Sequence, residues 1–209
     1  MTEPKVSGGA ITNAVPESVA KVQHSEPKVY LVGRLAAQFL DEVNIGGKKI
    51  IPRLGFGSLG LLGGGRKEDL HFTLIVSDAY SGIFGFDGQP SLDKASLGFI
   101  RIEYYRNILP RGILVQIDIS PPDGMSQSLF AQRLVMHAYN FASHTLDYSA
   151  PERLIGSTMV AGEYNSSSFV SGLLNSVMGY VPRIDVPGYQ TPGWEMPIPA
   201  SYFKGEALR

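Results

Sequence analysis

Residues 162–178 read Gly-Glu-Tyr-Asn-Ser-Ser-Ser-Phe-Val-Ser-Gly-Leu-Leu-Asn-Ser-Val-Met, and this stretch decides the fold. Its apolar residues recur at Phe169, Leu173 and Val177, and again one position further along, which is the spacing of a helix with one buried stripe. The helix is predicted to begin at the serines, where a side-chain oxygen can accept a hydrogen bond from a backbone N–H that has no partner within the helix. The pattern therefore predicts a buried helix with a polar start.

The polar start of this helix has two interpretations. Asn165 or Ser167 can serve as the N-cap, which is the common use of such residues. The hydroxyl of Ser166 or Ser167 lies where the helix dipole is positive, so the anionic form of a nucleophile would be stabilised there. The segment alone favours the cap, and a catalytic interpretation needs support from the rest of the chain.

The composition describes one globular domain and limits its functions. The chain has 209 residues, of which 44% are hydrophobic and 18% are charged, which suffices for a substantial core. A net charge of −1, without a basic cluster interleaved with aromatic residues, argues against nucleic acid as a partner. Because the sequence contains no cysteine, disulfides, thiolate metal sites and a cysteine nucleophile are excluded.

Polarity divides the chain into an arm and a domain. Residues 1–28 are rich in Ser, Pro, Glu and Lys and are predicted to be a flexible arm, whereas residues 29–209 are predicted to form a single α+β domain with a Pro-rich C-terminal segment. No run of about 18 apolar residues occurs, and the N-terminus lacks the pattern of a signal peptide. We therefore expect no transmembrane segment, and any export would use a route that needs no cleaved leader.

Several apolar runs predict the remaining elements. Four of them are predicted to form one antiparallel sheet: 70–76, 83–89, 97–105 and 113–119. Residues 29–40 are predicted to be a strand that leads into a short helix, followed by a Gly46-Gly47 turn and a second apolar stretch at 50–54. A helix is predicted from about 125 to 146, with Phe130, Leu134, Phe141 and Thr145 on its inner side. The Pro-rich end can be neither regular helix nor central strand, and Trp194, Tyr202 and Phe203 are expected to hold it against the domain.

Two sequence patterns suggest binding sites but lack the residues or the spacing that those sites require. Residues 55–65 hold six glycines in eleven positions, but no Gly-Lys-Ser/Thr follows, so we interpret them as a mobile loop or hinge and not as a phosphate-binding loop. His137 and His144 are two helical turns apart, about 10 Å, which is too far for two ligands of one metal ion. We predict neither a metal nor a cofactor.

His71 is the candidate base. It opens the run 70–76, and a hairpin folded about Tyr80 would place it opposite Gln89 and diagonally beside Asp87, with the side chains on one face of the sheet. A carboxylate or amide in that place can fix the tautomer of the histidine. The geometry depends on the register, because a slip of one residue moves Asp87 to the other face.

The order of these segments resembles the circularly permuted branch of the NlpC/P60 papain-like superfamily, which includes lecithin:retinol acyltransferase-like proteins. In that branch the histidine opens an early strand, and the nucleophile comes later, at the start of a helix, in an Asn-Cys-x-x-Phe-like setting. Residues 70–76 match the strand, and Asn165-Ser166-Ser167-Ser168-Phe169 match the helix start with serine in place of cysteine. The resemblance covers roughly residues 65–178 and implies a papain-like α+β fold, in which a central antiparallel sheet packs against helices and the nucleophile begins a buried helix.

The resemblance implies an acyl-transfer mechanism with three residues. Ser166 attacks a carbonyl carbon, His71 takes the proton and later returns it, and Asp87 orients the imidazole. Gln89 and Glu103 are alternative third residues. Backbone N–H groups at the helix start would stabilise the oxyanion.

Serine in place of cysteine is a departure from that family and leaves three interpretations open. Serine is a poor nucleophile without a base, whereas a thiol forms appreciable thiolate near neutral pH. The chain is a serine enzyme with His71 as base, a domain that has lost catalysis and kept binding, or a cysteine-to-serine replacement that traps an inactive form. In a non-catalytic chain His71 only hydrogen-bonds within the sheet, Asp87 belongs to an Asp-Gly turn, and Ser167 is the cap.

The function that the resemblance implies is hydrolysis of an amide bond in peptidoglycan peptides by a secreted antibacterial effector. Type VI secretion is the expected route by analogy, an immunity protein is the expected partner, and the periplasm of a target cell is the expected place of action, with the cytoplasm otherwise. The alternative on the same scaffold is a lipid esterase or acyltransferase, for which residues 55–65 and the Pro-rich end would supply an apolar groove.

Overall fold

The part of the chain that the structure describes has an α+β fold with one main antiparallel sheet and two α-helices. The computed structural model describes residues 26–35, 44–45, 48–49, 69–78, 82–90, 100–107, 109–110, 112–141, 146–148, 162 and 164–204. Its elements in chain order are β1 (Lys28–Leu35), β2 (Asn44–Ile45), β3 (Lys48–Lys49), β4 (Leu70–Asp78), β5 (Gly82–Pro90), β6 (Ile100–Arg106), β7 (Val115–Asp118), α3 (Gln127–Tyr139), α4 (Ser166–Met178) and the 3₁₀ helix η2 (Ala200–Phe203).

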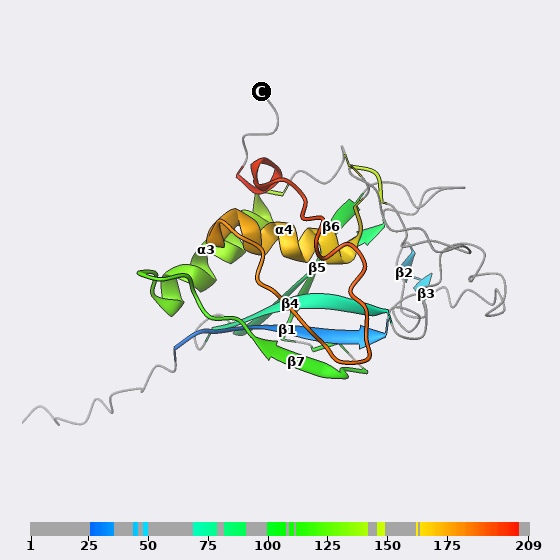
Figure 1. The fold of residues 1–209 in the computed structure, drawn as a ribbon, viewed down its shortest axis with the longest axis horizontal. Helices are drawn as coiled ribbons and strands as arrows, with labels where there is room; N and C mark the ends of the chain where they lie inside the picture. Colours follow the sequence, from blue (N-terminus) through cyan, green and yellow to red (C-terminus); the bar gives the residue numbers. More distant parts are fainter. Residues whose placement is uncertain are drawn as a thin grey trace, which may run out of the picture.

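The main sheet has five strands in the order β6-β5-β4-β1-β7, and every neighbouring pair is antiparallel (Figure 1). The four predicted strands all belong to one antiparallel sheet, as predicted. β1, whose place in a sheet was not predicted, lies between β4 and β7. The side chains from Val29 to Val32 are all buried, on both faces of the strand, which suits an interior strand and not an edge. β2 and β3 form a separate ladder on either side of the predicted Gly46-Gly47 turn.

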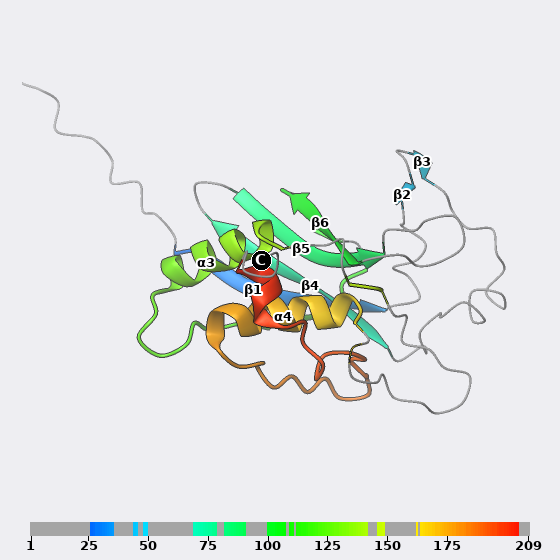
Figure 2. The ribbon, with the colours of Figure 1, turned by 90° about the horizontal axis from the view of Figure 1, so that it is seen from above.

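Both helices lie on the same face of the sheet, as Figures 1 and 2 show from two directions. The strand residues that face them alternate along β4 as Phe72, Leu74 and Val76 and join the main core. Ile75, which points the opposite way, packs with Tyr30 and Val32 in a smaller cluster on the other face. The core therefore lies between the helices and β4, β1 and β5.

The predicted start of α4 at the serines is confirmed. The helix begins at Ser166, and Asn165 is its N-cap, with Oδ1 accepting from the Ser168 backbone N–H at 3.0 Å. The alternative that Ser167 is the cap is wrong, because Ser167 is the second residue of the helix itself. The helix ends at Gly179, which adopts the left-handed conformation that favours glycine at this position.

α3 is shorter than predicted. It ends at Tyr139 and not near 146, with Asn140 as its C-cap, and asparagine is a weak helix former. Phe130 and Leu134 point inward as predicted, and Phe141, which follows the helix, packs its ring against Phe169 and Phe203. Thr145 and His144 lie outside the described residues, as do the predicted segments 36–40, 50–54 and 55–65.

The Pro-rich C-terminal segment passes back over the domain without regular helix or central strand up to η2, as predicted. Trp194 and Phe203 are fully buried in the main core, and Tyr202 is partly buried against it. Among the helices of the described part, none is both long and apolar enough to cross a membrane.

Candidate active site

Three buried side chains from three separate elements form a hydrogen-bonded row. His71 at the start of β4 brings Nδ1 to 2.7 Å from Ser166 Oγ at the start of α4, and its Nε2 lies 2.6 Å from Asp87 Oδ2 in β5. Ser166 is 6% exposed, His71 3% and Asp87 0%. The structure thus brings together the three residues that the sequence selected, although 95 positions separate His71 from Ser166.

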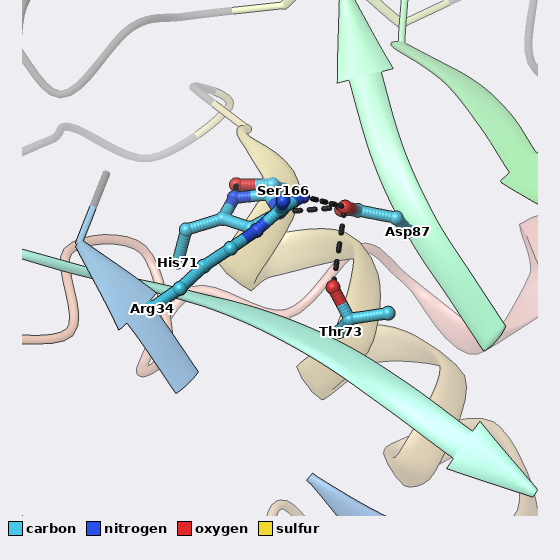
Figure 3. A network of polar contacts seen from close by, with 5 residues as sticks. All are labelled: Arg34, His71, Thr73, Asp87 and Ser166. Carbon is cyan, nitrogen blue, oxygen red and sulfur yellow. Dashed lines mark hydrogen bonds and ion pairs between the residues drawn. The ribbon is translucent and has the colours of Figure 1, made fainter. Parts of the chain in front are cut away.

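The sheet opens where these residues meet. The β4–β5 pairing runs from Asp78–Gly82 to Leu74–Phe86, which is the register predicted for a hairpin about Tyr80, and it stops there. Beyond that point β4 pairs with β1 and β5 pairs with β6, so the two strands diverge. Figure 3 shows the side chains in this gap with the start of α4 against them. Ser166 can therefore reach His71 even though strand alternation places His71 on the same side as Ile75.

Gly88 allows the first turn of α4 to pack closely against β5. A Cβ atom at this position would lie 2.6 Å from Phe169 Cβ and 3.3 Å from Ser166 Cα. Any larger residue would push the first turn of α4 away from β5, so the glycine in the predicted Asp-Gly pair serves close approach.

The contacts of the Asp87 carboxylate converge on Oδ2. Besides His71, Thr73 Oγ1 donates to Oδ2 at 3.3 Å, and the Arg34 guanidinium lies 3.6 Å from it (Figure 3). Arg34 is itself buried and stands directly opposite His71 in the β1–β4 ladder. Within the described part of the chain, Asp87 Oδ1 has no hydrogen-bond partner. The guanidinium compensates the charge of a carboxylate that has no access to water.

The polar residues of the helix start divide into distinct tasks. Asn165 caps the helix through Oδ1 and donates from Nδ2 to the Pro192 carbonyl at 3.0 Å. Ser168 Oγ donates to the Gly193 carbonyl at 3.0 Å. Ser167 is buried. Because Asn165 makes the cap, the Ser166 hydroxyl is not needed for capping and is turned toward His71.

Tyr148 is a further group at the site that the sequence analysis missed. Burial acts most strongly on the pKa of its phenol, and the hydroxyl and backbone N–H of Ser166 lie near enough to lower that pKa in part. Burial is the main cause that raises the pKa of Tyr148 to about 12, so its phenol stays protonated at neutral pH. An isolated bridge between Tyr148 and Tyr164 holds it beside the start of α4.

The other candidate residues lie elsewhere. Gln89 and Glu103 belong to β5 and β6, with Glu103 opposite Asp87, but their side chains lie outside the described part, and the acid that contacts His71 is Asp87. His137 lies in α3 and pairs with Ser176 of α4 at 2.8 Å, far along the helix from Ser166. Among the described residues no group of three or more His, Asp or Glu side chains could hold a metal ion.

Arg34, Thr73 and Tyr148 had different signals in the sequence. Thr73 shares the face of His71 two residues along the same strand, so alternation alone could have selected it. Arg34 is a charged residue within an apolar run, which marks it as buried and paired. Nothing around Tyr148 distinguishes it from other tyrosines. Its place depends entirely on the tertiary fold.

Comparison with known proteins gave no match to a family model, a curated protein or a solved structure.

Proposed function

We propose that this chain is an acyl hydrolase in which Ser166 is the nucleophile, His71 the general base and Asp87 the residue that orients the base. The observation that carries the proposal is the row Ser166–His71–Asp87, with contacts of 2.7 and 2.6 Å. A nucleophile, a base within hydrogen-bond reach and a third group on the far ring nitrogen are the parts that such chemistry needs. The capping explanation of the serine is weakened because Asn165 fills that role.

The hydrogen bonds set the direction of proton transfer. An ionised Asp87 can only accept, so His71 Nε2 carries its proton and donates to Oδ2, and Nδ1 is left as the acceptor for the Ser166 hydroxyl. As Ser166 Oγ bonds to a substrate carbonyl carbon, its proton passes to Nδ1 and the carbonyl oxygen becomes an oxyanion. When the carbonyl re-forms, the bond to the leaving group breaks and the imidazolium protonates that group. Water, deprotonated by His71, then attacks the acyl ester and releases Ser166. The ring nitrogens are exchanged relative to the Ser-His-Asp arrangement of chymotrypsin-like proteases, but the division of labour is the same.

The start of α4 supplies donors for the oxyanion. The Ser166 backbone N–H is among the groups at a helix start that have no partner within the helix, and the helix dipole adds positive potential there. The Tyr148 phenol lies near this N–H, so it stands beside the place where a carbonyl oxygen would be held. Tyr148 keeps its proton and can donate to the oxyanion from beside it, and such a donor typically contributes about 3 kcal/mol.

The substrate class rests on the resemblance of residues 70–76 and 165–169 to the permuted NlpC/P60 branch. On that ground we propose an amide bond in peptidoglycan peptides as the target, and an antibacterial effector, carried by type VI secretion and neutralised by an immunity protein, as the biological setting. A lipid ester cleaved on the same scaffold is the alternative.

The proposal is tested by incubating the purified chain with isolated peptidoglycan and with phospholipid vesicles, and following the products by mass spectrometry. We expect new peptide amines and carboxylates from the wild type and none from Ser166→Ala. Fatty acid release without peptide products would assign the lipid alternative. Activity in Ser166→Cys but not in the wild type would mean that the serine stands in for a cysteine, and inactivity of both on every substrate would favour a binding domain.

A further inference from the structure

The residues on both sides of His71 are held by the C-terminal segment 190–198. The Leu70 backbone N–H donates to the Gln190 carbonyl at 2.8 Å, next to a parallel bridge between Asp69 and Gln190. On the other side, the Phe72 ring meets the Trp194 ring edge to face, with centroids 5.4 Å apart. The segment therefore holds the start of β4 from both neighbours of the base.

The same segment also holds the residues around Ser166. Asn165 Nδ2 donates to the Pro192 carbonyl, and Ser168 Oγ donates to the Gly193 carbonyl, each at 3.0 Å. The Ile198 backbone N–H donates to the Ser168 carbonyl at 3.0 Å. Four residues, 190–193, thus connect the start of β4 to the start of α4.

Segment 190–198 is firmly shaped and anchored. Trp194 is 1% exposed, and its indole N–H donates to the Pro182 carbonyl at 3.0 Å. Two turns, from Trp194 N–H to Thr191 and from Met196 N–H to Gly193, fold the segment on itself. The β4–β5 ladder ends at Leu74–Phe86 and does not reach His71, so the hydrogen bonds of segment 190–198 add a connection that this ladder does not provide.

We infer that segment 190–198 is the element that sets the distance between the Ser166 hydroxyl and the His71 imidazole, with Gly193 and Asn165 as positioning residues. The effect on the rate of acyl transfer rests on the proposed function, whereas the effect on the distance between Ser166 and His71 does not. A shift of about 1 Å in such a pair is enough to slow acyl transfer about 100-fold.

Gly193 offers a sharp test because the chain contains a matched control. A Cβ atom at Gly193, where φ is +85°, would overlap Asn165 Oδ1 and lie 2.7 Å from Ser168 Oγ. Gly188, two residues before this segment, has φ of +81°, and a Cβ there meets no atom within 4 Å. Gly193→Ala and Gly188→Ala therefore carry the same backbone strain, and only Gly193→Ala pushes on the start of α4.

The experiment compares the two variants with the wild type by two readouts. The ¹⁵N signals of the His71 ring, assigned through their loss in His71→Ala, report the contact with Ser166 without any substrate. The rate of labelling by a fluorophosphonate probe reports the reactivity of Ser166. We expect Gly193→Ala to shift the His71 signals and to slow labelling about 100-fold, while Gly188→Ala keeps both at wild-type values and lowers the melting temperature less than Gly193→Ala does.

A second variant decides the case if Gly193→Ala does not fold. Asn165→Ser keeps an N-cap oxygen but loses the donor to the Pro192 carbonyl. It should therefore slow labelling and shift the His71 signals while the helix content of the protein stays unchanged. Unchanged His71 signals in both Gly193→Ala and Asn165→Ser, or equal shifts in Gly188→Ala, would overturn the inference. A wild type that is not labelled at all would instead defeat the proposed function, and the His71 signals would still judge the positioning role.

Discussion

Asp87 is completely buried, and a carboxylate without water is costly unless its charge is compensated. Oδ2 accepts from His71 and Thr73 and faces the Arg34 guanidinium, so this buried oxygen has both hydrogen-bond donors and a compensating charge. This single oxygen decides which nitrogen of His71 carries the proton. The acid therefore acts on the Ser166 hydroxyl only through the imidazole.

Asp87→Asn tests this dependence at nearly constant shape. An amide that donates to His71 Nε2 would leave the proton on Nδ1, and Nδ1 could then no longer accept from Ser166. We expect kcat to fall by about 10³- to 10⁴-fold, as for the corresponding change in other triads, with an unchanged circular dichroism spectrum. Activity that stays within about tenfold of the wild type would remove Asp87 from the mechanism.

Tyr148→Phe tests the phenol at the start of α4. If the phenol donates to the oxyanion, its loss should lower kcat by about 10²- to 10³-fold with little change in KM. Steady-state kinetics on the substrate that the peptidoglycan and vesicle assay yields measures both constants. A faster variant would contradict the donor role and show that the phenol blocks the place of the substrate oxygen.

At the scale of elements, α3 and α4 are joined by a second histidine–serine contact with a different character. Ser176 Oγ donates to the Leu173 carbonyl at 2.7 Å, so it accepts from His137 Nδ1–H at 2.8 Å. Desolvation lowers the pKa of His137 below its usual value, and the charges of Lys204 and Arg133 lower it further. The serine's proton is engaged within its own helix. We therefore interpret the pair as a link between helices and not as a second nucleophile.

This link makes stability depend on pH in one direction. The folded state favours neutral His137. In the unfolded chain the pKa of this imidazole is about 6.5, so the unfolded chain binds more protons than the folded one as the pH drops through that value, and the free energy of unfolding falls. His137→Gln keeps a donor toward Ser176 but cannot titrate. Urea unfolding at pH 7.5 and pH 5.5 should give a larger loss for the wild type than for the variant. Equal losses in the free energy of unfolding would show that His137 does not contribute to its pH dependence.

Local patterns predicted the elements of the site better than their assembly. The apolar stripe and polar start of α4, and the hairpin register about Tyr80, follow from spacing over fewer than about twenty residues. The place of β1 between β4 and β7 does not, because several strand orders satisfy the same alternation. Local patterns also do not predict that Tyr148 lies near Ser166 or that residues 190–193 contact both sides of the site. These contacts join segments that are distant in the sequence.

At the scale of the whole molecule, the fold brings one short segment from each of four regions to a single point. The start of β4 supplies His71, β5 supplies Asp87, α4 supplies Ser166, and the C-terminal segment connects the first of these to the third. The main core beneath them is formed by the helices and the sheet.

The central claim is that Ser166 is a nucleophile activated by His71. The most direct test is intact-protein mass spectrometry after treatment with a fluorophosphonate, followed by peptide mapping of the adduct. We predict one adduct per chain on Ser166, none on Ser166→Ala, and labelling of His71→Ala slowed by at least about 100-fold. An unlabelled wild type, or an adduct on Ser166 that forms equally fast in His71→Ala, would contradict the claim.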